Sequence, residues 1–235
     1  MIDSAALRAR LALVLERIAR AAGRVGRDPA SVRLVAVSKT FSADFVRAAA
    51  DNGQRDFGEN RLQEALPKMD RTADLGLTWH LVGHLQSNKA RRAAERFAMI
   101  HSVDSSGLLA RLEEAAVTAG RRVELLVQVD LAEEPTKHGA SAPEARAILA
   151  QAAACRQAVV TGLMVLPPFD EDPDRARPYF AELKRLRDDF ASAGVPPAML
   201  AELSMGMSHD LEVAVEEGAT IVRVGSAIFG PRPPF

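Results

Sequence analysis

Lys39 is the residue whose type and position most directly suggest covalent chemistry. Only five of the 30 basic residues are lysines, so the chain uses arginine where it needs positive charge alone. Lys39 comes shortly after the apolar run 32–37, at the end of a predicted strand. Burial there would lower the pKa of its amine, and a neutral amine can attack an aldehyde to form a Schiff base. From position alone, a lysine whose amine extends to solvent is the alternative.

Two segments in the last 35 residues of the sequence contain glycine and serine and predict a site that binds an anion. Residues 204–208 read SMGMS and precede a predicted helix, and Gly225-Ser226 precedes a shorter one. In a parallel α/β barrel the loops after the last two strands commonly bind phosphate, because unpaired backbone N–H groups converge there. Either segment alone is typical of a turn, whereas the two together indicate a phosphate site.

Three other groups of polar residues are better explained by structure than by chemistry. His80 and His84 have the spacing of two metal ligands on a helix, but on a strand they would be about 13 Å apart, too far for one ion. The acidic segment 170–174 lacks the spacing of a calcium loop and predicts a solvated helix start. Lys68 and Lys184 are predicted to lie on helix surfaces. We therefore expect no metal site.

The elements that must position these groups alternate between short apolar runs and longer segments of helical period. The predicted strands are residues 32–37, 55–57, 78–82, 98–103, 123–129, 159–165, 201–204 and 220–224. The predicted helices are residues 4–22, 42–52, 61–69, 88–96, 106–119, 141–155, 174–193 and 208–217, with a short one at 227–230. Apolar strands joined by helices indicate a parallel sheet that is covered on both faces.

This order of elements predicts an α/β fold, a (β/α)8 TIM barrel that forms one domain over residues 1–235. An open, doubly wound sheet is the alternative, because both folds alternate strands and helices. The sequence has neither a GxGxxG fingerprint nor a P-loop, either of which would support the open sheet. The closed barrel is therefore the prediction.

The composition argues against several classes of protein. With 30 basic and 31 acidic residues the net charge is −1, which does not suit a dedicated binder of nucleic acid or acidic membranes. The longest uncharged run, residues 157–169, is shorter than the about 18 to 20 residues that span a membrane. The single cysteine, Cys155, cannot form an internal disulfide. We predict that it lies on a buried helix, where its side chain packs in the core. These features favour a cytoplasmic location.

Seven segments together resemble the pyridoxal-phosphate homeostasis proteins, which are relatives of the N-terminal barrel of alanine racemase. In order they are LVAVSK at 34–39, FGENR at 57–61, WHLVGHLQ at 79–86 with Asn88-Lys89, KHG at 137–139, GLM at 162–164, LSMGMS at 203–208 with Asp210, and VRVG at 222–225 with IFG at 228–230. The chain departs from the family pattern at Asp130 and Val165, both near the expected pocket.

The resemblance implies a barrel of fold-type III that binds pyridoxal 5′-phosphate (PLP), with Lys39 as the Schiff-base lysine. It places Arg223 at the pyridine nitrogen of PLP. The residues that it implies around the phosphate are Ser204, Gly206, Gly225 and Ser226. Those that it implies in the rest of the pocket are Asn60, His84 and Met164.

The implied function is storage or delivery of PLP, which balances amino-acid metabolism, by a monomer that hands the cofactor to PLP-dependent apo-enzymes. A permanent cation at Arg223 fits this role, because it discourages protonation of the ring nitrogen and weakens the cofactor as an electron sink. The related racemases use a tyrosine from a second domain, whereas Tyr179, the only tyrosine here, lies in a predicted helix. We assign no catalytic residue. A small PLP-dependent enzyme, such as a weak amino-acid racemase, and a cofactor-free Schiff-base aldolase are the alternatives.

Overall fold

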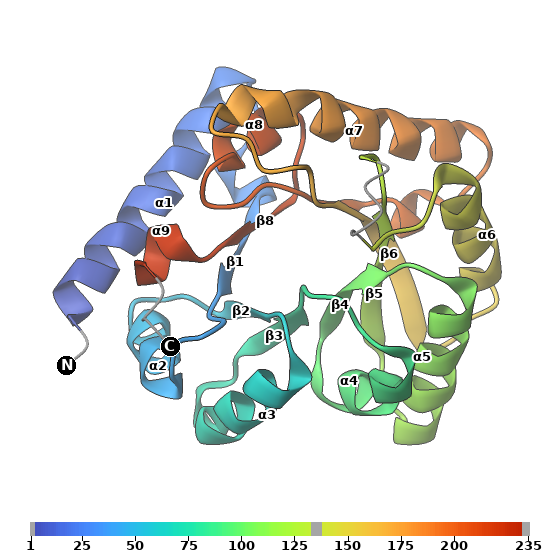
Figure 1. Cartoon of the computed structure of the whole chain (residues 1–235), viewed down its shortest axis with the longest axis horizontal. Helices are drawn as coiled ribbons and strands as arrows, with labels where there is room; N and C mark the ends of the chain where they lie inside the picture. Colours follow the sequence, from blue (N-terminus) through green and yellow to red (C-terminus); the bar gives the residue numbers. More distant parts are fainter. Residues whose placement is uncertain (1–2, 133–137, 232–235) are drawn as a thin grey trace.

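Eight parallel strands close into a barrel in the computed structural model, which describes residues 3–132 and 138–231 (Figure 1). Each strand pairs with the next in the chain, and β8 pairs with β1. The strands are β1 (Arg33–Val37), β2 (Asp56–Glu59), β3 (Thr78–Leu81), β4 (Met99–Val103), β5 (Val123–Val129), β6 (Ala158–Val165), β7 (Glu202–Ser204) and β8 (Ile221–Val224). The predicted closed barrel is confirmed, and the open sheet is wrong.

The helices cover the outside of the barrel (Figure 1). They are α1 (Ser4–Arg24), α2 (Ala43–Asp51), α3 (Leu62–Arg71), α4 (Ala90–Arg96), α5 (Ser106–Ala119), α6 (Ala142–Ala152), α7 (Arg177–Ser192), α8 (Leu211–Glu216) and α9 (Ser226–Phe229). Helix α5 has the predicted bounds. Helix α6 ends three residues early, so Cys155 lies in the following loop and is only half-buried, contrary to the prediction. No helix in the described part of the chain is long and apolar enough to cross a membrane.

Alternate strand residues fill the inside of the barrel. One interior cluster consists of Val35, Met99, Leu126, Met164 and Ile221, all at most 1% exposed. Gly58 also faces inward, because a Cβ at this position would lie 2.9 Å from Cγ1 of Val35. A side chain on β2 at this level would therefore displace the interior packing.

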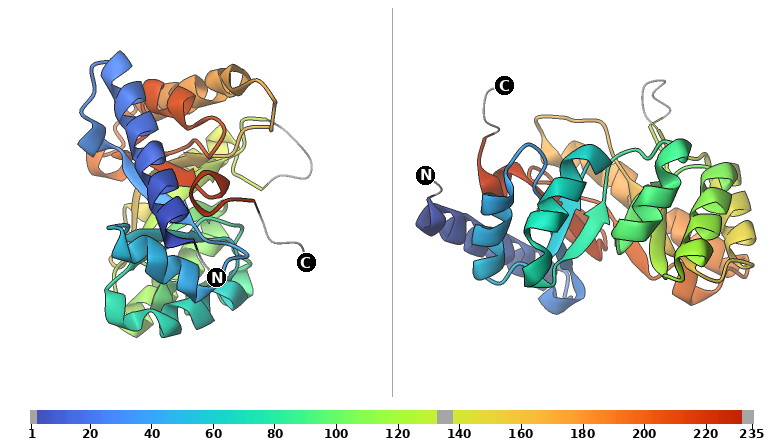
Figure 2. Two further views of the ribbon diagram at one scale, coloured as in Figure 1. Left: turned by 90° about the vertical axis from the view of Figure 1, so that its left-hand side faces the viewer. Right: turned by 90° about the horizontal axis from the view of Figure 1, so that it is seen from below.

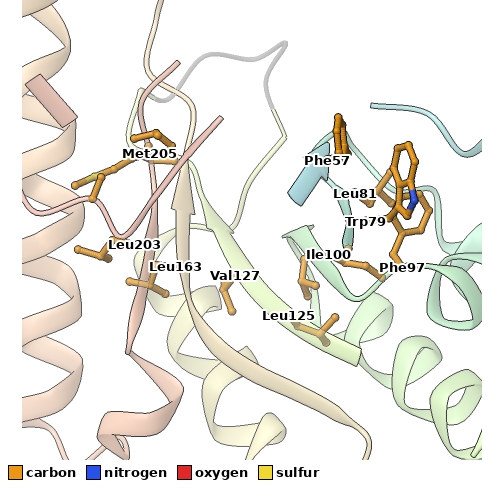
Figure 3. Packing of buried hydrophobic residues seen from close by; sticks show 14 of the residues in the cluster. Phe57, Trp79, Leu81, Phe97, Ile100, Leu125, Val127, Leu163, Leu203 and Met205 are labelled. Carbon is orange, nitrogen blue, oxygen red and sulfur yellow. The ribbon is translucent and has the colours of Figure 1, made fainter. Parts of the chain in front are cut away.

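The remaining strand residues face outward and pack under the helices. Figure 3 shows Phe57, Trp79 and Phe97 grouped on one side of the barrel, and Leu163 and Leu203 on the other. The rings of Phe57 and Trp79 have centroids 5.7 Å apart, and Phe57 is fully buried. This outer layer is the larger hydrophobic core and fixes each strand end relative to the helix that follows it.

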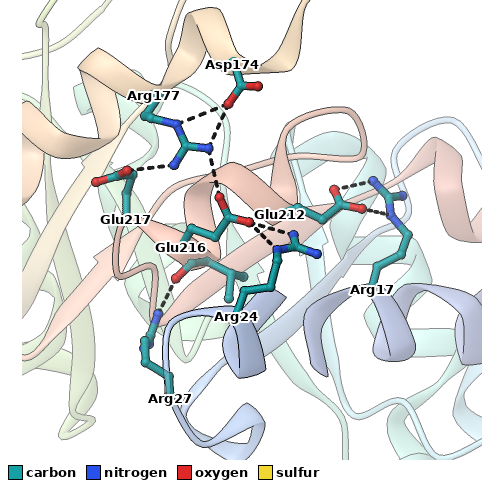
Figure 4. A network of polar contacts seen from close by, with 9 residues as sticks. Arg17, Arg24, Arg27, Asp174, Arg177, Glu212, Glu216 and Glu217 are labelled. Carbon is teal, nitrogen blue, oxygen red and sulfur yellow. Dashed lines mark hydrogen bonds and ion pairs between the residues drawn. The ribbon is translucent and has the colours of Figure 1, made fainter. Parts of the chain in front are cut away.

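Helix α1 comes before the first strand, yet it packs beside the last helices, α8 and α9 (Figure 2). Charged side chains join this seam (Figure 4). Arg17 bonds to Glu212 at 2.5 Å, and Arg24 bonds to Glu216 at 2.7 Å. Arg177 at the start of α7 bonds to the same Glu216 and to Glu217, each at 2.8 Å. Hydrogen bonds from Arg177 lower the pKa of the Glu216 carboxyl.

Candidate functional site

A cavity of about 670 Å³ lies at the carboxyl ends of the strands. Residues that follow seven of the eight strands line it, among them Lys39 after β1, Asn60 after β2, His84 after β3 and Gly225 after β8. Active and binding sites of (β/α)8 barrels lie at this end, where the loops converge. The geometry therefore marks this cavity as the candidate functional site.

Six of the nine residues that the sequence assigns to the site line this cavity. They are Lys39, Asn60, His84, Arg223, Gly225 and Ser226. The lining also contains Met207 and Ser208, which belong to the predicted phosphate segment 204–208, and residues to which we assigned no role, among them Phe41, Gln128 and His138. His138 belongs to a segment that carries the family resemblance, which is the signal that could have identified it.

The other three assigned residues, Met164, Ser204 and Gly206, lie behind the lining formed by the described residues. Met164 is fully buried in the interior cluster. Ser204 is also fully buried, and its hydroxyl bonds to Arg223. Gly206 has φ of 90°, and a Cβ there would lie 2.5 Å from Cβ of Ala214 on α8. These positions support the pocket from behind, and their predicted contact with a cofactor stays a prediction.

Lys39 is half-buried on the turn that follows β1. The next residue, Thr40, has φ of 69°, and it is the one non-glycine residue with a positive φ in the described ranges. Such a conformation is strained, so neighbouring contacts must hold it. The strain lies directly beside the lysine that the sequence singles out.

A buried ion pair holds Ser38, the residue just before this turn, and the Thr40 N–H itself donates to Oε2 of Glu64 at 3.4 Å. Nζ of Lys68 lies 2.6 Å from Oε1 of Glu59 and donates to the Ser38 carbonyl at 2.7 Å. The Ser38 hydroxyl donates to the same Oε1 at 2.6 Å, whereas Oε2 of Glu59 is buried without a partner. The prediction that Lys68 lies on the surface is wrong, because α3 turns it inward to meet Glu59. Burial raises the pKa of Glu59, and the charge of Lys68 opposes that rise.

The loops after β7 and β8 meet at Ser208. Its Oγ accepts from the backbone N–H of Gly225 at 3.2 Å and from that of Ala227 at 3.3 Å. Ser226 lies between them and is exposed at the cavity. The hydroxyls of Ser208 and Ser226, and the two backbone N–H groups that donate to Ser208, thus lie together at one side of the cavity, and such groups suit a phosphate.

Arg223 lies at the floor of the cavity and is 4% exposed. Its guanidinium donates to Oγ of Ser204 at 2.6 Å and to the Val165 carbonyl at 3.0 Å. Burial lowers the pKa of Arg223 to about 10, so the group stays cationic at neutral pH. Val165 contacts Arg223 through its backbone, so the departure from the family pattern at 165 leaves this contact intact. Asp130 accepts from the Ala132 N–H at 3.1 Å and is not among the lining residues.

His84 and His138 line the cavity, and together with Asp104 they place potential metal-ligating atoms within 4.8 Å of one another. The His84 and His138 rings stack with centroids 3.6 Å apart and planes inclined by 10°. A metal ion lies in the plane of each imidazole that binds it, and nearly parallel planes share no such point near the rings. The stacked arrangement therefore does not fit an ion. Burial, and the charge of His138, lower the pKa of His84.

Comparisons with known proteins agree on one family. The family model of the alanine racemase N-terminal domain matches residues 2–233. Pyridoxal phosphate homeostasis proteins from Pseudomonas aeruginosa and Aquifex aeolicus are 44% and 39% identical, over 94% and 95% of this chain and 94% and 97% of theirs.

Solved structures show the same relationship. The structure of PipY from Synechococcus elongatus with PLP bound is 42% identical, has a TM-score of 0.84, and is matched over 95% of this chain and 100% of that one. Alanine racemase from Clostridium difficile is 14% identical, with a TM-score of 0.72 over 94% of this chain and 60% of that one. At that identity the racemase likeness shows the fold alone.

Proposed function

This chain belongs to the alanine racemase N-terminal domain family and, within it, to the pyridoxal phosphate homeostasis proteins, and we propose that its cavity binds PLP covalently through Lys39. The observation that carries the proposal is the meeting of Lys39, Ser208, Ser226 and Arg223 in one cavity. The PipY structure with PLP bound, at 42% identity, supports the choice of cofactor.

The residues present suit each part of PLP. The Lys39 amine is placed to condense with the aldehyde, forming a Schiff base and releasing water. The hydroxyls of Ser208 and Ser226, with the backbone near Gly225, suit the phosphate dianion. When bound, PLP supplies an aldehyde that an amine can hold and a ring that can withdraw electrons. Arg223 is the residue proposed to face the ring nitrogen.

The arginine at the cavity floor favours storage and delivery over catalysis. A cation beside the ring nitrogen opposes its protonation, because two positive charges would then lie in one buried site. The ring would therefore withdraw electrons weakly. Among the described lining residues none is a tyrosine, and Tyr179 is half-buried on α7. We infer that PLP homeostasis is the role, with PLP-dependent apo-enzymes as the recipients and a cytoplasmic monomer as the working form.

Adding PLP to the purified protein tests the binding proposal. We expect a visible absorbance band that saturates at one PLP per chain and stays with the protein through desalting. Incubation with L-alanine in heavy water then separates storage from catalysis, because racemisation exchanges the α-hydrogen. We expect no α-deuteration at enzyme-like rates, which run from about 1 to 1,000 per second. A protein that gains no absorbance would contradict the binding proposal, and rapid deuteration would replace storage with racemase activity.

A further inference from the structure

A continuous row of hydrogen bonds runs through the inside of the barrel to Arg223. Oδ1 of Asp56 lies 2.9 Å from Nε2 of His80, and Nδ1 of His80 lies 3.0 Å from Nε2 of His101. Nδ1 of His101 lies 2.8 Å from Oγ of Ser204, which accepts from Arg223 at 2.6 Å. The row thus joins four side chains on four different strands to the cavity floor.

The row connects the two ends of the barrel. Asp56 is the first residue of β2, at the amino end of the strands, and its side chain is 27% exposed. His80, His101 and Ser204 are all fully buried. Arg223 lines the cavity at the carboxyl end. Asp56 is therefore linked to the cavity although it does not line it.

With both imidazoles neutral, the two charged ends favour one order of the protons between them. The guanidinium of Arg223 can only donate, so Oγ of Ser204 accepts from it and can turn its own hydrogen toward Nδ1 of His101. At the other end the Asp56 carboxylate can only accept, so His80 carries its proton on Nε2. Nδ1 of His80 then accepts from Nε2–H of His101. With both imidazoles neutral, every group in the row has a partner.

Reversing this order leaves a conflict. If His101 carried its proton on Nδ1, its Nε2 would need a proton from Nδ1 of His80. A neutral His80 would then face the Asp56 carboxylate with a lone pair at 2.9 Å. Burial, together with the nearby His80 and Arg223, holds the pKa of His101 well below its usual range, which agrees with a neutral ring.

We propose that Asp56, His80, His101 and Ser204 form a relay that orients the Arg223 guanidinium under the bound cofactor. His101 and Asp56 are then positioning residues, because they act on the cavity only through Arg223. The effect on the cofactor rests on the proposed function, whereas the order of the protons does not. Hydrogen bonds aligned between a cation and an anion also reinforce one another.

Nitrogen-15 NMR of the histidine side chains, recorded on the cofactor-free protein, tests the proton order. We expect His80 and His101 both to be neutral and protonated on Nε2 at pH 7.5. A proton on Nδ1 of His101, or a doubly protonated His80, would overturn the relay. This readout does not depend on whether the chain binds PLP.

Variants of Asp56 test the effect on the cavity. Asp56→Leu removes the carboxylate that accepts from His80 at the amino end of the barrel. We expect PLP affinity to fall roughly tenfold, which is typical of one lost charge-assisted hydrogen bond, and the absorbance maximum of the bound cofactor to shift. Asp56→Asn keeps an acceptor oxygen and should remain close to wild type. Glu124→Leu is the matched control, because Glu124 is a half-buried acid near the amino end of β5.

The outcomes separate the two proposals. A wild-type protein that never binds PLP would contradict the proposed function and leave the NMR test to decide the order of the protons. A wild type that binds PLP, with Asp56→Leu and Glu124→Leu equal in affinity and spectrum, would overturn the relay alone. His101→Gln gives a second measurement if Asp56→Leu fails to fold, with the same expected loss of affinity.

Discussion

The Lys39→Ala variant is expected to lose covalent retention of PLP completely. The wild-type protein should keep its visible absorbance through desalting, whereas the variant should elute colourless. Its affinity in a fluorescence titration should fall by roughly a hundredfold or more, about 3 kcal/mol, because only contacts to the phosphate and ring remain. Ser208, Ser226 and Arg223 still line the cavity, so weak binding should persist.

Lys184→Ala is the matched control for this variant. Lys184 is exposed on α7 and does not line the cavity, so its loss should leave absorbance and affinity unchanged. Thermal unfolding of both variants shows whether they remain folded. A folded Lys39→Ala protein that retained the wild-type absorbance after desalting would contradict the role of Lys39.

The largest loss of stability is expected from Lys68→Met. The change leaves Glu59 fully buried without its cation, and breaking one partner of a buried pair typically costs about 3–5 kcal/mol. Urea unfolding monitored by circular dichroism measures the loss. Glu59→Gln combined with Lys68→Met should recover part of it, because no buried carboxylate then remains.

The loss of stability in Lys68→Met should depend on pH in a defined direction. Burial already raises the pKa of Glu59, and removing Lys68 takes away the charge that opposes this rise. A group whose pKa is higher in the folded state binds protons more tightly there, so its contribution favours folding at low pH and is lost as pH rises through the folded pKa. Lys68→Met should therefore be less destabilised relative to wild type at pH 5 than at pH 8. Equal destabilisation at both values, or none, would contradict the buried pair.

The order of elements along the sequence was enough to predict the barrel. Apolar runs such as 123–129 have no polar alternation, which is typical of strands covered on both faces, and this one matches β5 in full. The bounds were less predictable where turns compete with helix ends. Helix α8 begins at Leu211 and not at 208, because Asp210 accepts from the Met207 N–H at 2.6 Å and holds a turn there.

Site residues that follow strands could be predicted, and those that depend on packing between elements could not. Lys39, Asn60 and His84 each come just after a strand, so the barrel geometry places them at the cavity. To predict the ion pair between Glu59 and Lys68, one must know how α3 is oriented against β2, and no local sequence pattern specifies that. To predict the relay, one must likewise know the register of the four strands that carry its side chains. His80 was correctly expected to pack within its strand, but its partners were not foreseen.

The assignment of Lys39 as the covalent attachment point is tested most directly by chemical reduction. The PLP-loaded protein is treated with borohydride, which makes the link between amine and cofactor permanent, and the modified peptide is located by mass spectrometry. The chain has five lysines, at 39, 68, 89, 137 and 184, and 137 lies outside the described residues. We predict a single modification, on Lys39. Modification at another lysine, or none in a protein that has bound PLP, would contradict the account.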